Sequence, residues 1–335
     1  MSERPLPIPF GWYGVSYSDE LKVGEVKPIA YFGKQLVLFR TESGEAKVLD
    51  AYCPHLGAHL GHGGKVQGEN IACPFHGWQF NGSGQCAAVP YAKNMPPKVA
   101  NGKQAIYAYP TVERNQMIWT WYHPHRIEPT HAVPVIPEFE SSDWVIVERL
   151  EWKFNVIMQD AAENACDAAH FVYVHGTTEV PAGEIEFDGI KRIGKYIAKV
   201  PKILEDGSFD PSGATANIYL TTISEGTGVA IQRFTGALET VLLGITSPLT
   251  ANSVIMRFAF IRPKDSGPAQ QMMAEFAKME ICRQVEGDIP IWEHKIYLEN
   301  PTLCDGDGPI HQFRKWYRQF YAELNDTPTN IRVAS

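Results

Sequence analysis

Two different patterns of hydrophobic and polar positions divide the chain. From Val23 to Tyr122, short runs rich in β-branched and aromatic residues alternate with turn residues, as in IAYFG, LVLFRTESGEAKVLDAY, WQFNGSGQCAAV and MIWTWYHP. The Glu-Ser-Gly-Glu stretch inside the second run predicts a hairpin turn. Short strands separated by turns in this way predict an all-β domain.

The pattern changes after a proline-rich stretch. HPHRIEPTHAVPVIPEFE has four prolines between residues 124 and 137 and predicts a linker. A helical pattern follows at about 156–175, then the strand-like runs ANIYLTTIS, VAIQRF, ETVLLGIT and SVIMRFAFIRP, and a long helical pattern from Pro268 to about Tyr297. We therefore expect an α+β fold in two domains, residues 1–133 and residues 134–335, the second an antiparallel sheet with helices at either end.

Composition restricts the functional classes. The chain has 335 residues, 44% of them hydrophobic, which is enough for two domains with sizeable cores. A net charge of -8 without a long Lys/Arg run argues against nucleic acid as a partner. The opening MSERPLPIPFGWYG lacks the apolar run of a signal peptide, and no apolar run is long enough for a transmembrane span. The six cysteines are scattered, so we expect a reduced, soluble, cytoplasmic protein rather than a disulfide framework.

The candidate chemistry begins with a dense group of Cys and His residues in CPHLGAHLGHGGKVQGENIACPFHGW, residues 53–78. Four of them form two pairs separated by seventeen residues: Cys53-x-His55 and Cys73-x-x-His76. Each pair lies in a segment containing Pro and Gly, which predicts a tight turn. Two such turns facing each other can hold one metal centre from two sides.

Two metal centres fit these residues. Two Cys and two His can bind one tetrahedral zinc ion, but a zinc finger normally pairs Cys with Cys and His with His. A Rieske [2Fe-2S] cluster takes two thiolates on one iron and two imidazoles on the other. The mixed pairs favour the Rieske cluster. His59 and His62 fit neither pair and are interpreted as loop residues, and Cys86 as a buried thiol.

A second candidate centre lies beyond the linker, in the stretch from Glu163 to Gly176. His170 and His175 would point about 140° apart on a regular helix. They converge if the helix ends or bulges between them, and Gly176 supplies a stop signal. Asp167 lies one turn before His170. Two His and one carboxylate form the facial arrangement that leaves iron positions open for dioxygen.

The carboxylate of this second centre is expected further along the chain. Spacing alone does not choose among the acidic residues of the C-terminal region: Glu280, Glu286, Asp288, Glu293, Asp305 and Asp307.

The two motifs together resemble those of the oxygenase components of Rieske non-haem iron oxygenases. C-x-H-x17-C-x2-H lies in the N-terminal β domain, and D-x2-H-x4-H follows it. The tail, with an acid ahead of Ile291-Trp292 and Lys295 and the closing DGPIHQFRKWYRQFY (307–321), resembles the 3-ketosteroid 9α-hydroxylase subfamily and the related insect and nematode cholesterol 7-desaturases. The resemblance is strongest at 45–97, 160–176 and 284–322, and weak between about 180 and 265.

The resemblance implies a fold and two cofactors. The fold is an all-β Rieske domain followed by a helix-grip catalytic domain, in which a curved antiparallel sheet surrounds a long helix. The cofactors are a [2Fe-2S] cluster and a mononuclear Fe(II). Among the acids, the resemblance selects Asp288. The implied ligands are Cys53, His55, Cys73 and His76 for the cluster, and His170, His175 and Asp288 for the iron.

It also implies roles for residues beside the ligands. Asp167 matches the acid that bridges a cluster ligand, here His76, to an iron ligand histidine across a subunit boundary in a head-to-tail homotrimer. We expect Glu163 and Asn164 to lie near the iron ligands. Trp292 is either a wall of the substrate pocket or helix core.

The implied activity is that of a terminal oxygenase in a multicomponent monooxygenase. An NADH-dependent iron-sulfur flavoprotein reductase, directly or through a ferredoxin, supplies electrons, and one atom of O2 enters a C–H bond of an apolar, 3-ketosteroid-like substrate. A sterol desaturase with the same iron centre and a plain Rieske electron carrier are the alternatives. The sequence names neither the steroid nor the position of reaction, because the residues at 180–265 should form much of the pocket.

Overall fold

A computed structural model describes residues 6–322 and divides the chain into two compact units. The smaller unit comprises residues 11–135 with 247–250, and the larger comprises 136–246 and the described residues after 250, together with those before Gly11. The backbone N–H of Phe10 donates to the carbonyl of Phe320, 2.8 Å away, which ties the start of the described chain to its end. The division after Val135 lies two residues beyond the boundary expected from the sequence.

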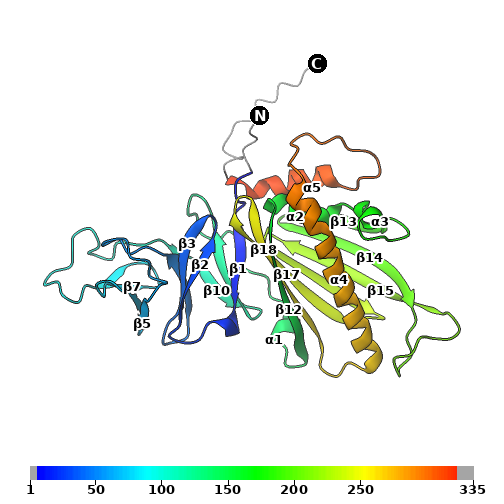
Figure 1. The fold of residues 1–335 in the computed structure, drawn as a ribbon, viewed down its shortest axis with the longest axis horizontal. Coiled ribbons are helices and arrows are strands. Elements are labelled where there is room, and N and C mark those ends of the chain that lie inside the picture. The colour runs from blue at the N-terminus through cyan, green and yellow to red at the C-terminus, as the bar shows by residue number, and fades with distance from the viewer. Residues whose placement is uncertain (1–5, 323–335) are drawn as a thin grey trace, which may run out of the picture. The chain divides into compact units, whose positions relative to one another are not determined.

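The smaller unit consists of short antiparallel strands and one 3-10 turn, η1 (Ser18–Glu20), as the sequence predicts. The strands form three sheets, in the orders β1-β11-β10, β2-β3-β4-β9 and β5-β6-β7-β8 (Figure 1). Their bounds are β1 Gly11–Tyr17, β2 Val26–Tyr31, β3 Lys34–Arg40, β4 Ala46–Asp50, β5 Lys65–Gln67, β6 Asn70–Ala72, β7 Gln79–Asn81, β8 Cys86–Ala88, β9 Ala108–Tyr109, β10 Thr111–Arg114 and β11 Met117–Tyr122.

The predicted hairpin turn joins β3 to β4. The N–H of Thr41 donates to the carbonyl of Glu45 at 2.9 Å, and Gly44 adopts a φ of 97°, which a side chain would disfavour. The strands pair in register from Leu36 with Asp50 onward. The prediction of a hairpin at this position is confirmed.

The larger unit is built on one seven-stranded sheet, in the order β12-β18-β17-β16-β15-β14-β13. Its strands are β12 Trp144–Asn155, β13 Gly183–Asp188, β14 Lys191–Pro201, β15 Thr215–Glu225, β16 Val229–Gly236, β17 Thr240–Thr250 and β18 Ser253–Pro263. Its helices are α1 Pro137–Glu140, α2 Met158–Glu163, α3 His170–Tyr173, α4 Pro268–His294 and α5 Ile310–Tyr317, with 3-10 turns η2 Asn164–Cys166 and η3 Arg318–Phe320.

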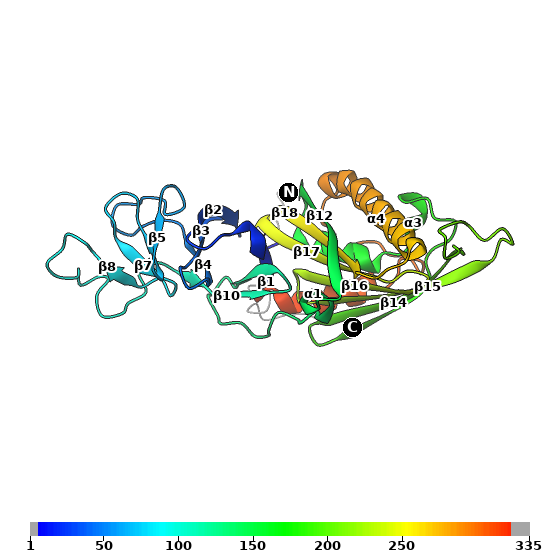
Figure 2. The same ribbon diagram turned by 90° about the horizontal axis from the view of Figure 1, so that it is seen from below.

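The long helix α4 crosses one face of this sheet (Figures 1 and 2). Near its start, Met273 and Ala274 pack in one buried cluster with Ile218 of β15. Further along, Val285, Asp288 and Trp292 are buried at the i, i+3, i+7 spacing of one helical face. A sheet packed around a long helix is the predicted helix-grip arrangement, and the helix ends three residues before the expected Tyr297.

The helix expected at 156–175 is broken. Helix α2 and turn η2 precede Asp167, which has an extended backbone, and α3 starts at His170. Oδ1 of Asp167 accepts a hydrogen bond from the backbone N–H of His170 at 3.3 Å. A short acidic side chain that bonds to nearby backbone in this way competes with helical hydrogen bonding. The break therefore has a local cause in the sequence.

In the larger unit, three strands were not expected from the sequence: β12, β13 and β14. In β13 the residues Glu184, Ile185, Glu186 and Phe187 alternate between charged and apolar, and only the apolar two are partly buried. This period of two is the signal that identifies a half-buried strand. It could have been read from the sequence.

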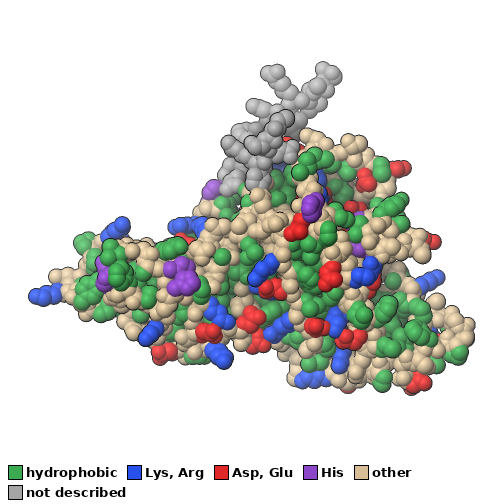
Figure 3. All heavy atoms as spheres, in the orientation of Figure 1, with side chains coloured by type: hydrophobic (Ala, Val, Ile, Leu, Met, Phe, Trp, Pro, Cys, Tyr) green, Lys and Arg blue, Asp and Glu red, His purple; other side chains and the backbone are tan. Residues whose placement is uncertain are grey.

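The surface of α4 is partly apolar. Met272, Phe276 and Met279 are 38%, 68% and 66% exposed, and hydrophobic side chains reach the surface on the face of the unit that α4 crosses (Figure 3). Despite this, none of the helices in residues 6–322 combines the length and the hydropathy needed to cross a membrane.

Candidate metal centres

Two turns of the same construction carry the paired Cys and His residues of the smaller unit. The N–H of Gly57 donates to the carbonyl of Cys53 at 2.9 Å, and the N–H of Gly77 donates to that of Cys73 at 3.0 Å. Both glycines have positive φ, 74° and 69°, so each turn needs a residue without a Cβ. The predicted tight turns are present, and each presents one Cys and one His.

The turns bring the four side chains together in an ordered way. Cys53 and Cys73 are buried, 3% and 5% exposed, and belong to the core of the unit. Burial raises the pKa of the Cys53 thiol to about 11, and the neighbouring Cys73 thiol contributes to the shift. The imidazoles of His55 and His76 lie with ring centroids 4.7 Å apart, and His55 stacks on Trp78 at 4.6 Å.

This arrangement fits a Rieske cluster. The thiols lie inside and the imidazoles lie further out, as a cluster with one Cys-bound and one His-bound iron requires. The buried Nδ1 of His76 has no hydrogen-bond partner among the described residues, so it is available to a metal. His59 and His62 contact each other, with ring centroids 4.5 Å apart, and Cys86 is buried in the core.

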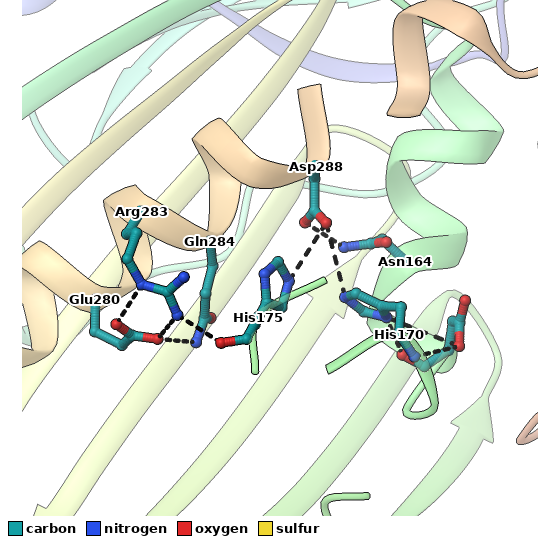
Figure 4. A network of polar contacts seen from close by, with 8 residues as sticks. Asn164, His170, His175, Glu280, Arg283, Gln284 and Asp288 are labelled. Atoms are coloured by element: carbon teal, nitrogen blue, oxygen red, sulfur yellow. Dashed lines mark hydrogen bonds and ion pairs between the residues drawn. The ribbon is translucent and has the colours of Figure 1, made fainter. Parts of the chain in front are cut away.

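In the larger unit, the predicted iron-binding residues converge. Nε2 of His175 lies 3.3 Å from Oδ1 of Asp288, and Nε2 of His170 lies 4.0 Å from the same oxygen. One ligand atom from each residue lies within 4.8 Å of the others, and no other such cluster occurs in the described part of the chain. Figure 4 shows Asp288 projecting from α4 toward both imidazoles.

The two histidines converge because the helix ends between them. Helix α3 stops at Tyr173, and Gly176 has a φ of 76°. The His170 and His175 rings lie with centroids 4.9 Å apart. A continuous helix would have directed them apart. The structure thus meets the condition that the sequence analysis set for their convergence.

Hydrogen bonds orient these side chains. Nδ1 of His170 donates to the backbone carbonyl of Asp167 at 2.5 Å, which directs Nε2 toward Asp288. That Nε2 is buried and has no hydrogen-bond partner among residues 6–322. The amide Nδ2 of Asn164 donates to Oδ2 of Asp288 at 2.9 Å and leaves Oδ1 facing the imidazoles. Such outer contacts fix the tautomer and direction of metal ligands.

The electrostatics of the site suit a cation. Burial raises the pKa of Asp288 to about 6, against the charge of His170, which lowers it. Burial, with the charge of His170, lowers the pKa of His175. For His170, burial lowers the pKa, but the hydrogen bond to Asp167 and the charge of Asp288 outweigh it, and the pKa is raised. A divalent metal would supply positive charge beside the buried Asp288 carboxylate.

The other candidate acids lie elsewhere. Glu280 is bound by Arg283 at 2.5 Å and 2.8 Å, and Oε1 of Glu293 accepts the backbone N–H of Asn155. Glu286 is exposed. Asp307 accepts the backbone N–H of Cys304, and Asp305 is exposed. Asp288 is the acid of this set that is buried beside the histidines.

A cavity of about 140 Å³ adjoins the histidines and Asp288. Trp292 lines it and also stacks on Phe154 of β12, with ring centroids 5.3 Å apart. Trp292 is therefore both a cavity wall and a packed core residue, so neither of the two alternatives describes it alone.

The remaining residues expected near the iron have distinct surroundings. The side chain of Asp167 is 41% exposed, and the hydrogen bond from His170 lowers the pKa of its carboxyl. Glu163 forms two hydrogen bonds with Arg314 of α5, at 2.6 Å and 2.9 Å. The Asn164 contact with Asp288 was expected only in general terms, because it depends on how α2 packs beside α4.

Comparisons with known proteins identify a family for each of the two units. Residues 11–109 match the Rieske [2Fe-2S] domain family, and residues 120–321 match the 3-ketosteroid 9α-hydroxylase C-terminal domain family. A 3-ketosteroid-9-alpha-monooxygenase oxygenase component of Rhodococcus rhodochrous is 33% identical over 98% of this chain and 88% of its own length. The cholesterol 7-desaturase nvd of Xenopus laevis is 32% identical over 97% of this chain and 74% of its own length.

Solved structures share the fold. The apo form of dicamba monooxygenase superposes with a TM-score of 0.71 at 18% identity, covering 95% of this chain and 98% of that chain. Another structure of the same protein is described as containing non-heme iron and dicamba.

These findings confirm the expected Rieske cluster over zinc, and an oxygenase over a plain electron carrier. The Rieske domain match also confirms the expected [2Fe-2S] cluster. The chain belongs to the 3-ketosteroid 9α-hydroxylase family of Rieske oxygenase components.

Proposed function

We propose that this chain is the terminal oxygenase of a multicomponent monooxygenase that hydroxylates a 3-ketosteroid-like substrate. The observation that carries the proposal is the convergence of His170, His175 and Asp288 beside a cavity, in a chain that matches the 3-ketosteroid 9α-hydroxylase family over residues 120–321. Electrons would enter through the domain of residues 1–133, and substrate would react in the domain of residues 134–335.

We assign the cofactor ligands as follows. Cys53, His55, Cys73 and His76 hold the [2Fe-2S] cluster, and His170, His175 and Asp288 hold the mononuclear iron. The cluster supplies single electrons, and the mononuclear iron supplies the activation of dioxygen. In support, three protein ligands leave coordination positions open, as non-haem iron oxygenases require.

The residues around the iron position and protect the reaction. Asn164 holds one oxygen of Asp288, so the other oxygen faces the imidazoles. Asp167 fixes the tautomer of His170 through its carbonyl. Trp292, held by its stacking on Phe154, gives the adjacent cavity a rigid apolar wall and is proposed to border the substrate.

We further propose a homotrimer in which Asp167 joins His76 of one subunit to His170 of the next. Two observations support the proposal. The Asp167 carboxyl is 41% exposed, so it is accessible to another chain. Leu56 and Phe75, which follow and precede the cluster histidines, are 64% and 61% exposed, an apolar rim that a second subunit would bury.

The electron donor is proposed to be an NADH-dependent iron-sulfur flavoprotein reductase, acting directly or through a ferredoxin. An oxygenase component requires such a partner, because the reaction consumes two electrons per substrate. We place the system in the cytoplasm, where NADH is available.

Sterol desaturation is the second candidate. It is favoured by the 32% identity to the cholesterol 7-desaturase of Xenopus laevis. The two reactions differ in their products, because hydroxylation adds one oxygen atom and desaturation removes two hydrogens.

The test is to incubate the purified protein with a suitable reductase, NADH and O2, and a panel of 3-ketosteroids and sterols, followed by mass spectrometry. Gain of one oxygen from labelled O2 in a 3-ketosteroid is the expected result. Loss of two hydrogens from a sterol would establish the desaturase instead. No product from any member of the panel, with both metal centres filled, would overturn the steroid proposal.

A further inference from the structure

The proposed reaction consumes protons as well as electrons. Inserting one oxygen atom into a C–H bond requires RH, O2, two electrons and two protons, and yields ROH and water. The reductase and the cluster account for the electrons. The protons must come from solvent and reach a buried site, since His175 and Asp288 are only 6% exposed. The inference below rests on the proposed function.

The cavity beside the iron-binding residues offers a polar route. Its volume of about 140 Å³ is enough for more than one water molecule. His170 and Asp288 line it, and so do Asp160 of α2 and Lys295, the residue after α4. The side chain of Lys295 is 35% exposed, so this part of the lining reaches solvent.

Asp160 lines the cavity beside the partly exposed Lys295. It is 4% exposed, and its Oδ1 is 3.5 Å from Nζ of Lys295. That oxygen is buried, and apart from this ion pair with Lys295 it accepts no hydrogen bond of ordinary geometry from the described residues. A buried carboxylate oxygen left in this state is costly unless water or a proton satisfies it. Its position on the cavity wall indicates which group would do so.

The other charged groups around Asp160 are already committed. Glu163, one turn along α2, forms the two hydrogen bonds with Arg314 described above, which occupy both of its carboxylate oxygens. The Arg314 guanidinium also lies over the Tyr297 ring, 5.0 Å from its centroid. Asp167 and Asp288 also line the cavity, but Asp167 is bonded to His170 and Asp288 faces both imidazoles. Asp160 is thus the cavity acid with an oxygen that is engaged neither by Arg314 nor by the proposed iron ligands.

The acidity of Asp160 agrees with this geometry. Burial raises its pKa, the charges of Lys295 and Arg314 lower it, and that of Glu163 raises it. The result is a pKa above the ordinary value for Asp, so this carboxyl takes up a proton more readily than a surface carboxyl does.

We propose that Asp160 is a proton-relay residue: Oδ1 passes a proton through cavity water toward the iron site and regains one from solvent at the Lys295 end. The relay changes no oxidation state and only moves the protons that the balanced reaction requires. An acid that only held α2 against the end of α4 would make the same contacts. The test must therefore distinguish proton transfer from this structural role.

The test compares Asp160→Asn and Asp160→Ala with Asp188→Asn, which makes the same isosteric change at an exposed acid of β13. Both Asp160 variants should retain iron and the Rieske spectrum. Their turnover should fall by about tenfold or more. The decrease should be smaller than that caused by losing a general acid completely, because water in the cavity still conducts protons. Formic acid, which fits the space left in Asp160→Ala, should restore part of the turnover of that variant but not of Asp160→Asn.

Infrared spectroscopy gives a second readout that does not depend on turnover. The wild-type protein should show a carboxylic acid C=O band that disappears on raising the pH and is missing in Asp160→Asn. Because Lys295 lowers the pKa of Asp160, the band should persist to higher pH in Lys295→Met.

Turnover of Asp160→Asn within about twofold of wild type, or loss of turnover that formic acid does not restore in Asp160→Ala, would overturn the relay. These outcomes are distinct from failure of the proposed function, in which the wild-type protein itself forms no steroid product while the infrared band can still be observed.

Discussion

Asn164 donates a hydrogen bond to Asp288 across two helical segments, with Nδ2 2.9 Å from Oδ2. This contact leaves a single oxygen of the carboxylate, Oδ1, to face His170 and His175. We expect Asn164→Ala to lower the affinity of the mononuclear site for Fe(II) by about tenfold or more, the usual effect of removing such a support. Competition with a chromophoric chelator measures this affinity.

The matched control is Asn300→Ala, because Asn300 is an exposed asparagine of the same unit. It should bind Fe(II) like wild type. If Asn164→Ala also bound Fe(II) with wild-type affinity, the orientation of Asp288 would have to come from its packing on α4.

The proposed iron ligands should be separable from the cluster. His170→Ala, His175→Ala and Asp288→Ala should each lose the mononuclear iron and all turnover, because each removes one of three protein ligands. The Rieske absorption should remain, since the cluster residues lie in the other compact unit. Iron analysis should fall from three to two atoms per chain. Retained iron and turnover in Asp288→Ala would instead point to Glu286 or Glu293 as the carboxylate ligand.

The cluster should be equally sensitive to its own ligands. Cys53→Ser or His55→Ala should abolish the Rieske absorption and its low-g EPR signal, because each removes one of only four ligands. The mononuclear site should still take up Fe(II). Val112→Ala, a change at an exposed position of the same unit, should leave the spectrum intact. A wild-type protein that contained zinc in place of iron and sulfide would contradict this assignment.

The centres differ in how far the sequence could predict them. The cluster residues are visible in the sequence as two short pairs, Cys53 with His55 and Cys73 with His76. Each pair is close in sequence because both of its side chains come from one turn. His170 and His175 are also local, although their convergence depends on the end of α3. Asp288 needed the family resemblance, since periodicity did not separate it from neighbouring acids.

Contacts between distant elements could not be predicted. The hydrogen bond between Asn164 and Asp288, and the place of Asp160 on the cavity wall, depend on how α2 packs beside the C-terminal half of α4. No local pattern encodes that packing. The missed strand β13 is a different case, because the alternation at Ile185 and Phe187 was present in the sequence and was not used.

Arg283 of α4 bonds to the backbone of a proposed iron ligand, His175. Its Nη2 donates to the carbonyl of His175 at 2.8 Å, and Glu280 fixes the guanidinium (Figure 4). Because Asp288 lies on the same helix, this contact sets the distance between His175 and Asp288. We expect Arg283→Ala to lower Fe(II) affinity by up to about tenfold. It should also change the rhombicity of the EPR signal of the nitric oxide adduct, which reports ligand geometry.

A general loss of stability would not produce that spectroscopic change. Arg262→Ala, at an arginine that bonds to the backbone of its own strand, is the control and should leave the signal unaltered. An unchanged signal in Arg283→Ala would show that the loop at His175 is held by other contacts.

Asp167 tests electron transfer apart from metal binding. Asp167→Asn keeps the size of the side chain but removes the negative charge that would join the histidines of two subunits. The Asp167 carbonyl, which orients His170, is retained, so both centres should stay filled, with three irons per chain and a normal Rieske spectrum. Product formation should fall by at least about tenfold. In single-turnover experiments from a reduced cluster, reoxidation in the presence of substrate and O2 should be slow.

Mixed trimers test whether Asp167 acts across the boundary between two subunits. Asp167→Asn chains have an intact cluster but no bridge, and Cys53→Ser chains have the bridge but no cluster. If the bridge joins different chains, mixing the two should restore some activity, because some interfaces then pair an intact cluster with an intact bridge. If it lies within one chain, no mixture can regain activity. If Asp167→Asn reoxidised its cluster at the wild-type rate, the Asp167 carboxylate would have no part in electron transfer. The residue would then act only through its backbone carbonyl, which orients His170.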